Sequence, residues 1–176
     1  MNPFADVPEG SFYINPVLWA VENEITNGAS ADSFNPNGQC QRAQVVTFLW
    51  RAFGCPEPSS SVNPFADVKE NDFFYKPVLW AVENGITNGV DSTHFGSYAY
   101  CNRAQVVTFL WRASGSPRPT TNKSPFADVV KGSFFFDPVL WAVENGITNG
   151  IDGTSFGVDG VCNRAQVVTF LYRAYN

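Results

Sequence analysis

Arginines recur at a fixed spacing of 61 residues, in a setting that could receive an acidic ligand. Six of the seven arginines occupy only two positions of this spacing. The first set, which we call the helix-start arginines, comprises Arg42, Arg103 and Arg164. Each precedes Ala-Gln-Val-Val-Thr-Phe-Leu, whose apolar pattern predicts a helix. The macrodipole disfavours a cation at a helix N-terminus, whereas free N–H groups and a guanidinium together can form a carboxylate receptor.

An internal partner could also satisfy such an arginine. Each copy begins with Phe-Ala-Asp-Val, and an ion pair to its aspartate would need no ligand; we favour ligand contact. For the helix-end arginines we favour a structural role, because a cation suits a helix C-terminus; they are Arg51, Arg112 and Arg173. The leading aspartates could equally accept ligand hydroxyls or cap turn backbone; they are Asp6, Asp67 and Asp128.

The repeated cysteines, Cys40, Cys101 and Cys162, stand two residues before the helix-start arginines. A helix N-terminus and a nearby arginine both lower a thiol pKa, so these are candidate reactive thiols. A glutamine four residues later makes an internal thioester conceivable, although a small hydrophobe filling a half-buried site is the simpler interpretation. Disulfides fit poorly, because symmetry-related thiols are expected to lie far apart and Cys55 is the one extra partner.

The elements that must position these residues come from a threefold repeat. Long segments, such as Pro-Val-Leu-Trp-Ala-Val-Glu-Asn and Ile-Thr-Asn-Gly, are identical in all three copies. Each copy predicts a helix, a loop with a phenylalanine, and a second helix, and two short helices cannot bury the many aromatic residues alone. We therefore expect a mostly α-helical bundle with pseudo-threefold symmetry, one compact domain over 1–176, with repeats at 1–55, 62–116 and 123–176.

Local signals suggest where the helices begin and end. Asn15 and Asp137 are expected N-caps before a proline in the first turn, whereas Lys76 is not. The turn glycines are expected to stop the first helix; they are Gly28, Gly89 and Gly150. The second helix is expected to open at the repeated cysteine. The repeated tryptophans are expected in the core; they are Trp19, Trp80 and Trp141.

Composition excludes several classes of function. A net charge of −5, with 11 Lys and Arg against 16 Asp and Glu, argues against nucleic acid and anionic membranes as partners. The single histidine, His94, excludes most histidine-based metal centres, and we expect neither a metal nor a cofactor. No apolar run approaches the ~20 residues of a membrane span. No signal peptide is visible, so we expect either a cytoplasmic protein or a module of a longer exported chain.

The repeated motifs resemble the S-layer homology family over essentially the whole chain. The resemblance rests on Phe4-Ala5-Asp6-Val7, Trp19-Ala20, Gly85-Ile86-Thr87-Asn88-Gly89, Phe34-Asn35-Pro36 and Cys40-Gln41-Arg42-Ala43-Gln44. It implies a triangular domain that binds secondary cell-wall polysaccharide, usually with pyruvylated sugars, in grooves between repeats. It further implies that the helix-start arginines meet the acidic ligand and that the leading aspartates and turn glycines help line the grooves. The location implied is extracellular, on the cell wall of a Gram-positive-type bacterium.

Two departures from the family pattern bear on the site. The usual Thr or Ser is replaced by the repeated cysteines, and the usual Glu by glutamines that keep hydrogen bonding while removing a negative charge beside the anion; these are Gln44, Gln105 and Gln166. Repeat 1 also has Glu24 where the other copies have glycine. If Glu24 lies near the groove of Arg42, that groove should bind acidic glycan least well.

The leading function is therefore a noncovalent glycan-binding anchor, a monomeric module of a larger surface protein. The alternative is a protein-interaction module on the same scaffold. An enzyme is disfavoured, because no base accompanies each cysteine and an active site gains little from being tripled, whereas three equal weak binding sites give avidity.

Overall fold

The computed structural model describes residues 2–176, and these form six α-helices and no strand. Each repeat contributes a short outer helix and a longer inner one. The helices are α1 (Ile14–Glu22), α2 (Arg42–Ala52), α3 (Tyr75–Glu83), α4 (Arg103–Ala113), α5 (Phe136–Glu144) and α6 (Arg164–Tyr175). The expected mostly α-helical fold is confirmed.

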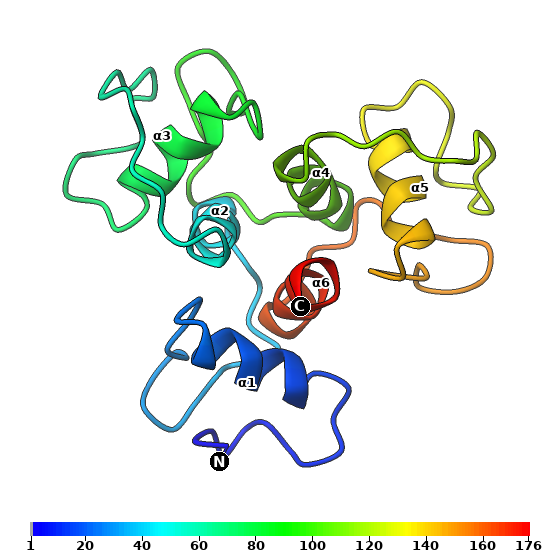
Figure 1. Cartoon of the computed structure of the whole chain (residues 1–176), viewed down its shortest axis with the longest axis horizontal. Helices are drawn as coiled ribbons and strands as arrows, with labels where there is room; N and C mark the ends of the chain where they lie inside the picture. The colour runs from blue at the N-terminus through cyan, green and yellow to red at the C-terminus, as the bar shows by residue number, and fades with distance from the viewer. Residues whose placement is uncertain (1) are drawn as a thin grey trace.

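The inner helices surround a central axis and the outer helices lie at the periphery (Figure 1). Each outer helix packs against the inner helix of the preceding repeat: α3 contacts α2, and α5 contacts α4. The first and last repeats close the ring, because α1 contacts α6. The repeats are therefore not independent units, and the bundle with pseudo-threefold symmetry is confirmed.

The repeated cysteines form a closed ring of backbone hydrogen bonds between the three repeats. The Cys40 N–H donates to the Cys162 carbonyl at 2.9 Å, the Cys101 N–H to Cys40 at 2.9 Å, and the Cys162 N–H to Cys101 at 3.0 Å. The expectation that these residues lie far apart is wrong. A spacing of 61 residues sets sequence separation only, and the packing of three equivalent segments brings them to one place.

The inner helices begin with a capping box rather than at the cysteine. The side-chain Oε1 atoms of Gln44 and Gln105 accept the backbone N–H of Gln41 and Asn102 at 2.9 and 3.1 Å, and Gln166 repeats this with Asn163. These contacts satisfy N–H groups that the first helical turn leaves unpaired. The inner helix therefore starts at the arginine, two residues after the predicted cysteine.

The outer helices begin earlier than their sequence predicts. Tyr13, not Asn15, is the N-cap of α1, and no side chain caps it. The preceding turn takes over this role, since the Ile14 N–H donates to the Ser11 carbonyl at 3.3 Å. Asp137 lies inside the first turn of α5, so its predicted capping role is also wrong. The core prediction for the tryptophans is confirmed for Trp80 and Trp141, while Trp19 is half-buried.

The outer helices end at a Schellman motif, well before the turn glycines. In α1 the Ile25 N–H donates to the Ala20 carbonyl at 2.8 Å and the Glu24 N–H to the Val21 carbonyl at 3.0 Å. The left-handed residue is Glu24, with φ of 57°, where Gly85 and Gly146 serve the other copies. The predicted stop at Gly28 is therefore wrong by four residues.

Glu24→Gly is expected to raise the free energy of unfolding by about 1 kcal/mol, because it removes a side chain from a left-handed backbone position. The reciprocal Gly146→Glu variant should lower the free energy of unfolding by a similar amount. No heavy atom lies within 4 Å of a Cβ built at Gly146, so this variant tests backbone strain without a steric clash. Urea unfolding of the three proteins measures both changes. A destabilised Glu24→Gly variant would show that Glu24 makes a compensating contact.

Candidate functional site

The helix-start arginines are buried at the seams between repeats. Arg42 is only 4% exposed. Its Nε donates to the Phe95 carbonyl at 3.0 Å and its Nη2 to Thr87 Oγ1 at 3.3 Å. The guanidinium lies 5.0 Å from the centre of the Phe95 ring and 5.3 Å from that of Phe109. All these partners belong to the second repeat, so Arg42 holds two repeats together.

The other two seams repeat this geometry. Arg103 donates to the Phe156 carbonyl and Thr148 at 2.9 and 3.1 Å. Arg164 closes the ring, because it donates to the Phe34 carbonyl at 2.8 Å and to Thr26 at 3.3 Å in the first repeat. Within residues 2–176 none of the three forms an ion pair with a carboxylate. The internal Arg–Asp bridge that the sequence left open is therefore not formed.

The leading aspartates instead bind the backbone of the phenylalanine loop. Asp67 accepts hydrogen bonds from the N–H groups of Phe95, Gly96 and Ser97 at 2.8 to 2.9 Å. Desolvation raises the pKa of Asp67, but these hydrogen bonds outweigh it and hold the pKa below its usual value. Asp6 and Asp128 bind their own loops in the same way. The aspartates thus cap turn backbone and shape the loop whose carbonyl receives the arginine.

A groove of about 240 Å³ opens beside Arg42, which we call the Arg42 groove. It brings together three residues that the sequence analysis proposed for ligand binding, from two repeats: Arg42, Gly89 and Gln105. Its other lining residues are Thr87, Asn88, Thr108, Phe109, Arg112 and Phe134. Phe134 comes from the third repeat and is 59% exposed, so this groove takes residues from all three repeats.

The Arg42 groove offers hydrogen-bond donors and positive charge. Arg42 Nη1 and the side-chain nitrogen of Gln105 make no hydrogen bond to any residue in the described chain. The helix-end arginine Arg112 adds a second guanidinium, although its Nη1 also donates to the Ile86 carbonyl at 3.0 Å. A carboxylate accepts well from such a set, because charged donors give stronger hydrogen bonds. The structural role predicted for the helix-end arginines therefore does not exclude ligand contact.

The turn glycines are required by close packing. A Cβ on Gly89 would lie 2.5 Å from the His94 carbonyl oxygen and 2.6 Å from the Phe65 ring, and φ is 82°. Gly28 and Gly150 make the equivalent approaches to Phe4 and Phe126. These glycines therefore fix the turn that carries the threonine and asparagine of the groove.

The repeated cysteines do not have the environment of reactive thiols. All three side chains are fully buried, and none forms a disulfide bond. Burial raises the pKa of Cys40 and Cys162 to about 12, outweighing the opposing effect of the neighbouring arginine. The pKa of Cys101 is raised for the same reason. The expected lowering of the thiol pKa is therefore wrong, and the conceivable thioester lacks both a thiolate and a free glutamine carbonyl.

A thiol reagent is expected to modify one cysteine of the native protein at pH 8, the exposed Cys55, and all four after unfolding. At a pKa of about 12, only about one in 10⁴ of the Cys40 or Cys162 thiols is ionised at that pH. Mass spectrometry of the labelled protein measures the count, and Cys55→Ser should reduce native labelling to none. Labelling of a buried thiol as fast as Cys55 would contradict this assignment.

Glu24 does not belong to the seam of Arg42. It lies just before Thr26, which binds Arg164, and beside Asn27 and Arg51. The expectation that Glu24 weakens the Arg42 groove therefore rests on the wrong pairing of repeats. Its negative charge belongs instead to the turn at the seam of Arg164.

Sequence reasoning missed two sets of groove residues. The arginine-binding threonines are Thr26, Thr87 and Thr148. The exposed phenylalanines, of which Phe134 lines the Arg42 groove, are Phe12, Phe73 and Phe134. Both sets recur at 61 residues, and this recurrence is the signal by which the sequence could have pointed to them.

Comparison with known proteins identifies the repeats. The S-layer homology domain matches residues 3–46, 64–107 and 125–168. The chain belongs to the S-layer homology domain family. S-layer homology domains are binding modules, and this membership supports a general role in anchoring at the cell wall. No helix in residues 2–176 has the length and hydropathy needed to cross a bilayer.

Three relatives contain similar segments. An endoglucanase of Bacillus sp. (strain KSM-635) is 33% identical over 63% of this chain and 12% of its own length. A cell surface protein of Thermoanaerobacter kivui is 29% identical over 65% of this chain and 16% of its length. A surface-layer 125 kDa protein of Lysinibacillus sphaericus is 31% identical over 51% of this chain and 8% of its length. The chain thus matches less than a fifth of the length of each of these relatives.

Proposed function

We propose that this S-layer homology chain binds acidic secondary cell-wall polysaccharide, bearing pyruvylated sugars, in the grooves at its three repeat seams. The observation that carries the proposal is the state of the helix-start arginines. Each is 4 to 7% exposed, donates two hydrogen bonds to protein oxygens and makes no ion pair within residues 2–176. A buried cation without a carboxylate partner is suited to receive one from a ligand.

The groove chemistry suits a pyruvyl ketal. Its carboxylate can accept from Arg42 Nη1 and from the side-chain amide of Gln105, while Arg112 adds charge. The flat, exposed ring of Phe134 offers an apolar face to a sugar ring. Three similar seams on one rigid ring also match a repeating polymer, because simultaneous weak contacts give avidity.

This role places the chain outside the cell, as a module of a larger protein on the envelope of a Gram-positive-type bacterium. Two of the relatives are surface proteins by name, and the third, an endoglucanase by name, matches this chain over only 12% of its length. A binding rather than catalytic role follows for this chain. A protein-interaction module on the same scaffold is the competing function, which the binding experiment separates.

Calorimetry with purified secondary cell-wall polysaccharide tests the proposal, using intact polymer and polymer from which the pyruvyl groups have been removed. We expect binding to the intact polymer and at least a tenfold loss after their removal. Neutral polysaccharide of similar length is the matched control ligand. Equal affinity for both polymers would overturn the acidic specificity, and no binding to either would favour the protein-interaction function.

A further inference from the structure

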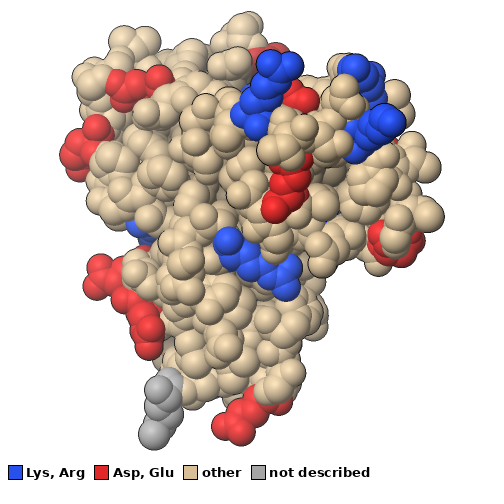
Figure 2. Space-filling model, turned by 45° about the vertical axis from the view of Figure 1, so that its right-hand side comes forward, with Lys and Arg blue, Asp and Glu red and all other residues tan. Residues whose placement is uncertain are grey.

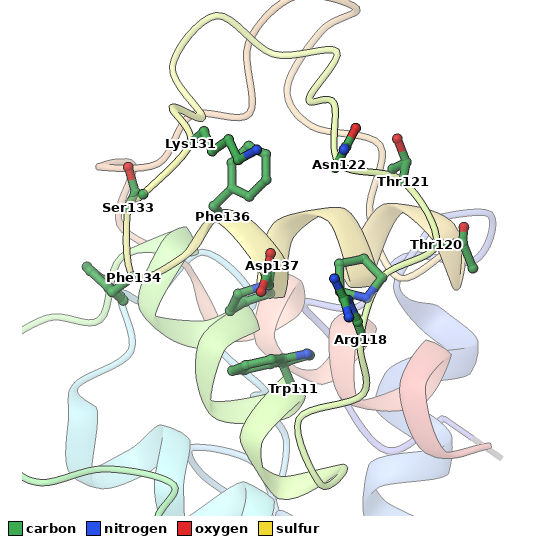
Figure 3. Close-up of a pocket in the computed structure, with 13 residues that line it drawn as sticks. Trp111, Arg118, Thr120, Thr121, Asn122, Lys131, Ser133, Phe134, Phe136 and Asp137 are labelled. Atoms are coloured by element: carbon green, nitrogen blue, oxygen red, sulfur yellow. The ribbon is translucent and has the colours of Figure 1, made fainter.

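A second and larger groove, of about 810 Å³, adjoins the Arg42 groove, and the two share Phe134. We call it the linker groove. One wall is the linker between repeats 2 and 3, at 118–122, and the other is the segment 131–134; α5 begins at its floor (Figure 3). Its lining residues are Trp111, Arg118, Pro119, Thr120, Thr121, Asn122, Lys131, Gly132, Ser133, Phe134, Phe136, Asp137 and Pro138. A ligand that passes Phe134 therefore reaches both grooves.

Two basic side chains line the linker groove from its two walls. Arg118 extends from the linker and Lys131 from the opposite wall, with Asp137 on the floor (Figure 3). Both are exposed, and neither forms an ion pair with any residue in the described chain. On the face shown in Figure 2, charged side chains are few and scattered among uncharged atoms. Against this lightly charged surface, the pair gives the groove a positive character.

The copy-related positions of the preceding repeat lack this basic pair. The positions 61 residues earlier hold Glu57 and Glu70 in place of Arg118 and Lys131. Glu57 there forms an ion pair with Lys76 at 2.7 Å, so the one basic side chain of the copy-related site is already paired. With Asp72 standing where this groove has Ser133, the copy-related charged side chains carry −2, whereas those of the linker groove carry +1.

The walls of the linker groove are held in place without a ligand. The N–H groups of Thr120 and Thr121 donate to the Glu144 carboxylate at 2.9 and 2.8 Å, which ties the linker to the end of α5. The Trp111 indole N–H donates to the Pro117 carbonyl at 2.8 Å and fixes the aromatic floor. A preformed groove loses little conformational entropy on binding.

We propose that the linker groove binds a second acidic residue of the same glycan strand whose first acidic residue occupies the Arg42 groove. This inference rests on the proposed function. Arg118 and Lys131 offer charged donors to a carboxylate from the two walls, while Asn122 and Ser133 can serve sugar hydroxyls. The three seams are then unequal, because the seam of Arg42, whose groove adjoins the linker groove at Phe134, reads a longer stretch of polymer.

The test compares a single pyruvylated sugar with a longer pyruvylated fragment of the polysaccharide, each titrated calorimetrically into the protein and into the double variant Arg118→Glu, Lys131→Glu. Both substitutions copy the residues that stand 61 positions earlier, Glu57 and Glu70, so folding should persist, and thermal unfolding checks this. The double variant should lose about tenfold in affinity for the longer fragment and less than twofold for the single sugar. Lys69→Glu, an exposed change outside both grooves, is the control for general charge; it alters the net charge by −2 against −4 for the double variant, so long-range charge alone predicts twice its loss in binding free energy.

An unchanged affinity of the double variant for the longer fragment would overturn the inference, as would a loss in binding free energy no more than twice that of Lys69→Glu. Equal losses for the single sugar and the longer fragment would also overturn it, because the groove would then act only through long-range charge. Failure of the unaltered protein to bind either fragment is a different result, since it would contradict the proposed function itself.

Discussion

Replacing Arg103 by alanine is expected to lower the free energy of unfolding by about 3 kcal/mol and to abolish binding of the acidic glycan at its seam. The substitution leaves the Phe156 carbonyl and Thr148 without their buried donor and removes two contacts with aromatic rings. An unpaired buried group costs about 1–3 kcal/mol, and a buried cation–aromatic contact adds about 1–2. Denaturant unfolding measures the first effect and glycan calorimetry the second.

Arg173→Ala is the matched control for this change. Arg173 belongs to the helix-end set, is exposed, and makes one hydrogen bond, to the Ile147 carbonyl at 3.0 Å. Its loss should cost about 1 kcal/mol. If both variants were destabilised equally, the buried seam would not depend on the helix-start arginine as the contacts indicate.

Replacing Gly89 by alanine is expected to be the most destabilising single methyl addition in the chain, by about 4 kcal/mol. The new Cβ would meet a backbone carbonyl at 2.5 Å, which cannot move without disturbing the turn, and the backbone is left-handed at 82°. Strain at such a position and overpacking each cost about 1–3 kcal/mol. The variant should also lose affinity in the Arg42 groove, which Gly89 lines.

Gly85→Ala separates the two causes. Gly85 is also left-handed, with φ of 66°, but no heavy atom lies within 4 Å of a Cβ built there. It should therefore lose only about 1 kcal/mol. Urea unfolding of both variants gives the difference, and equal losses would show that backbone strain alone, without the contact, explains the requirement for Gly89.

The repeat predicted the fold class because identical copies must bury identical faces, and two short helices cannot do so alone. It also indicated Arg42, Gly89 and Gln105, which the structure brings to one groove. It could not predict which copy faces which. Because the segments are identical, each helix-start arginine could contact the turn of its own copy or that of the next copy, and only tertiary packing decides between them. The prediction that Glu24 lies near Arg42 was wrong for this reason.

The errors about the cysteines and the helix ends have a different origin. Local rules assume a solvated helix start, where a nearby arginine lowers a thiol pKa, whereas tertiary packing removes Cys40 from water and burial dominates. Likewise, α1 begins at Ile14, whose N–H donates to the Ser11 carbonyl of the preceding turn, so Asn15 lies inside the helix and does not cap it. Tertiary structure overrides a local preference worth about 1 kcal/mol.

The most direct test of the central claim is a titration of the protein with a pyruvylated fragment, followed through the NMR signals of the arginine side-chain Nε–H groups. There are seven arginines, and the helix-start set should show the largest shifts, with saturation at the affinity measured by calorimetry. Saturable binding that leaves Arg42, Arg103 and Arg164 unperturbed would contradict the account.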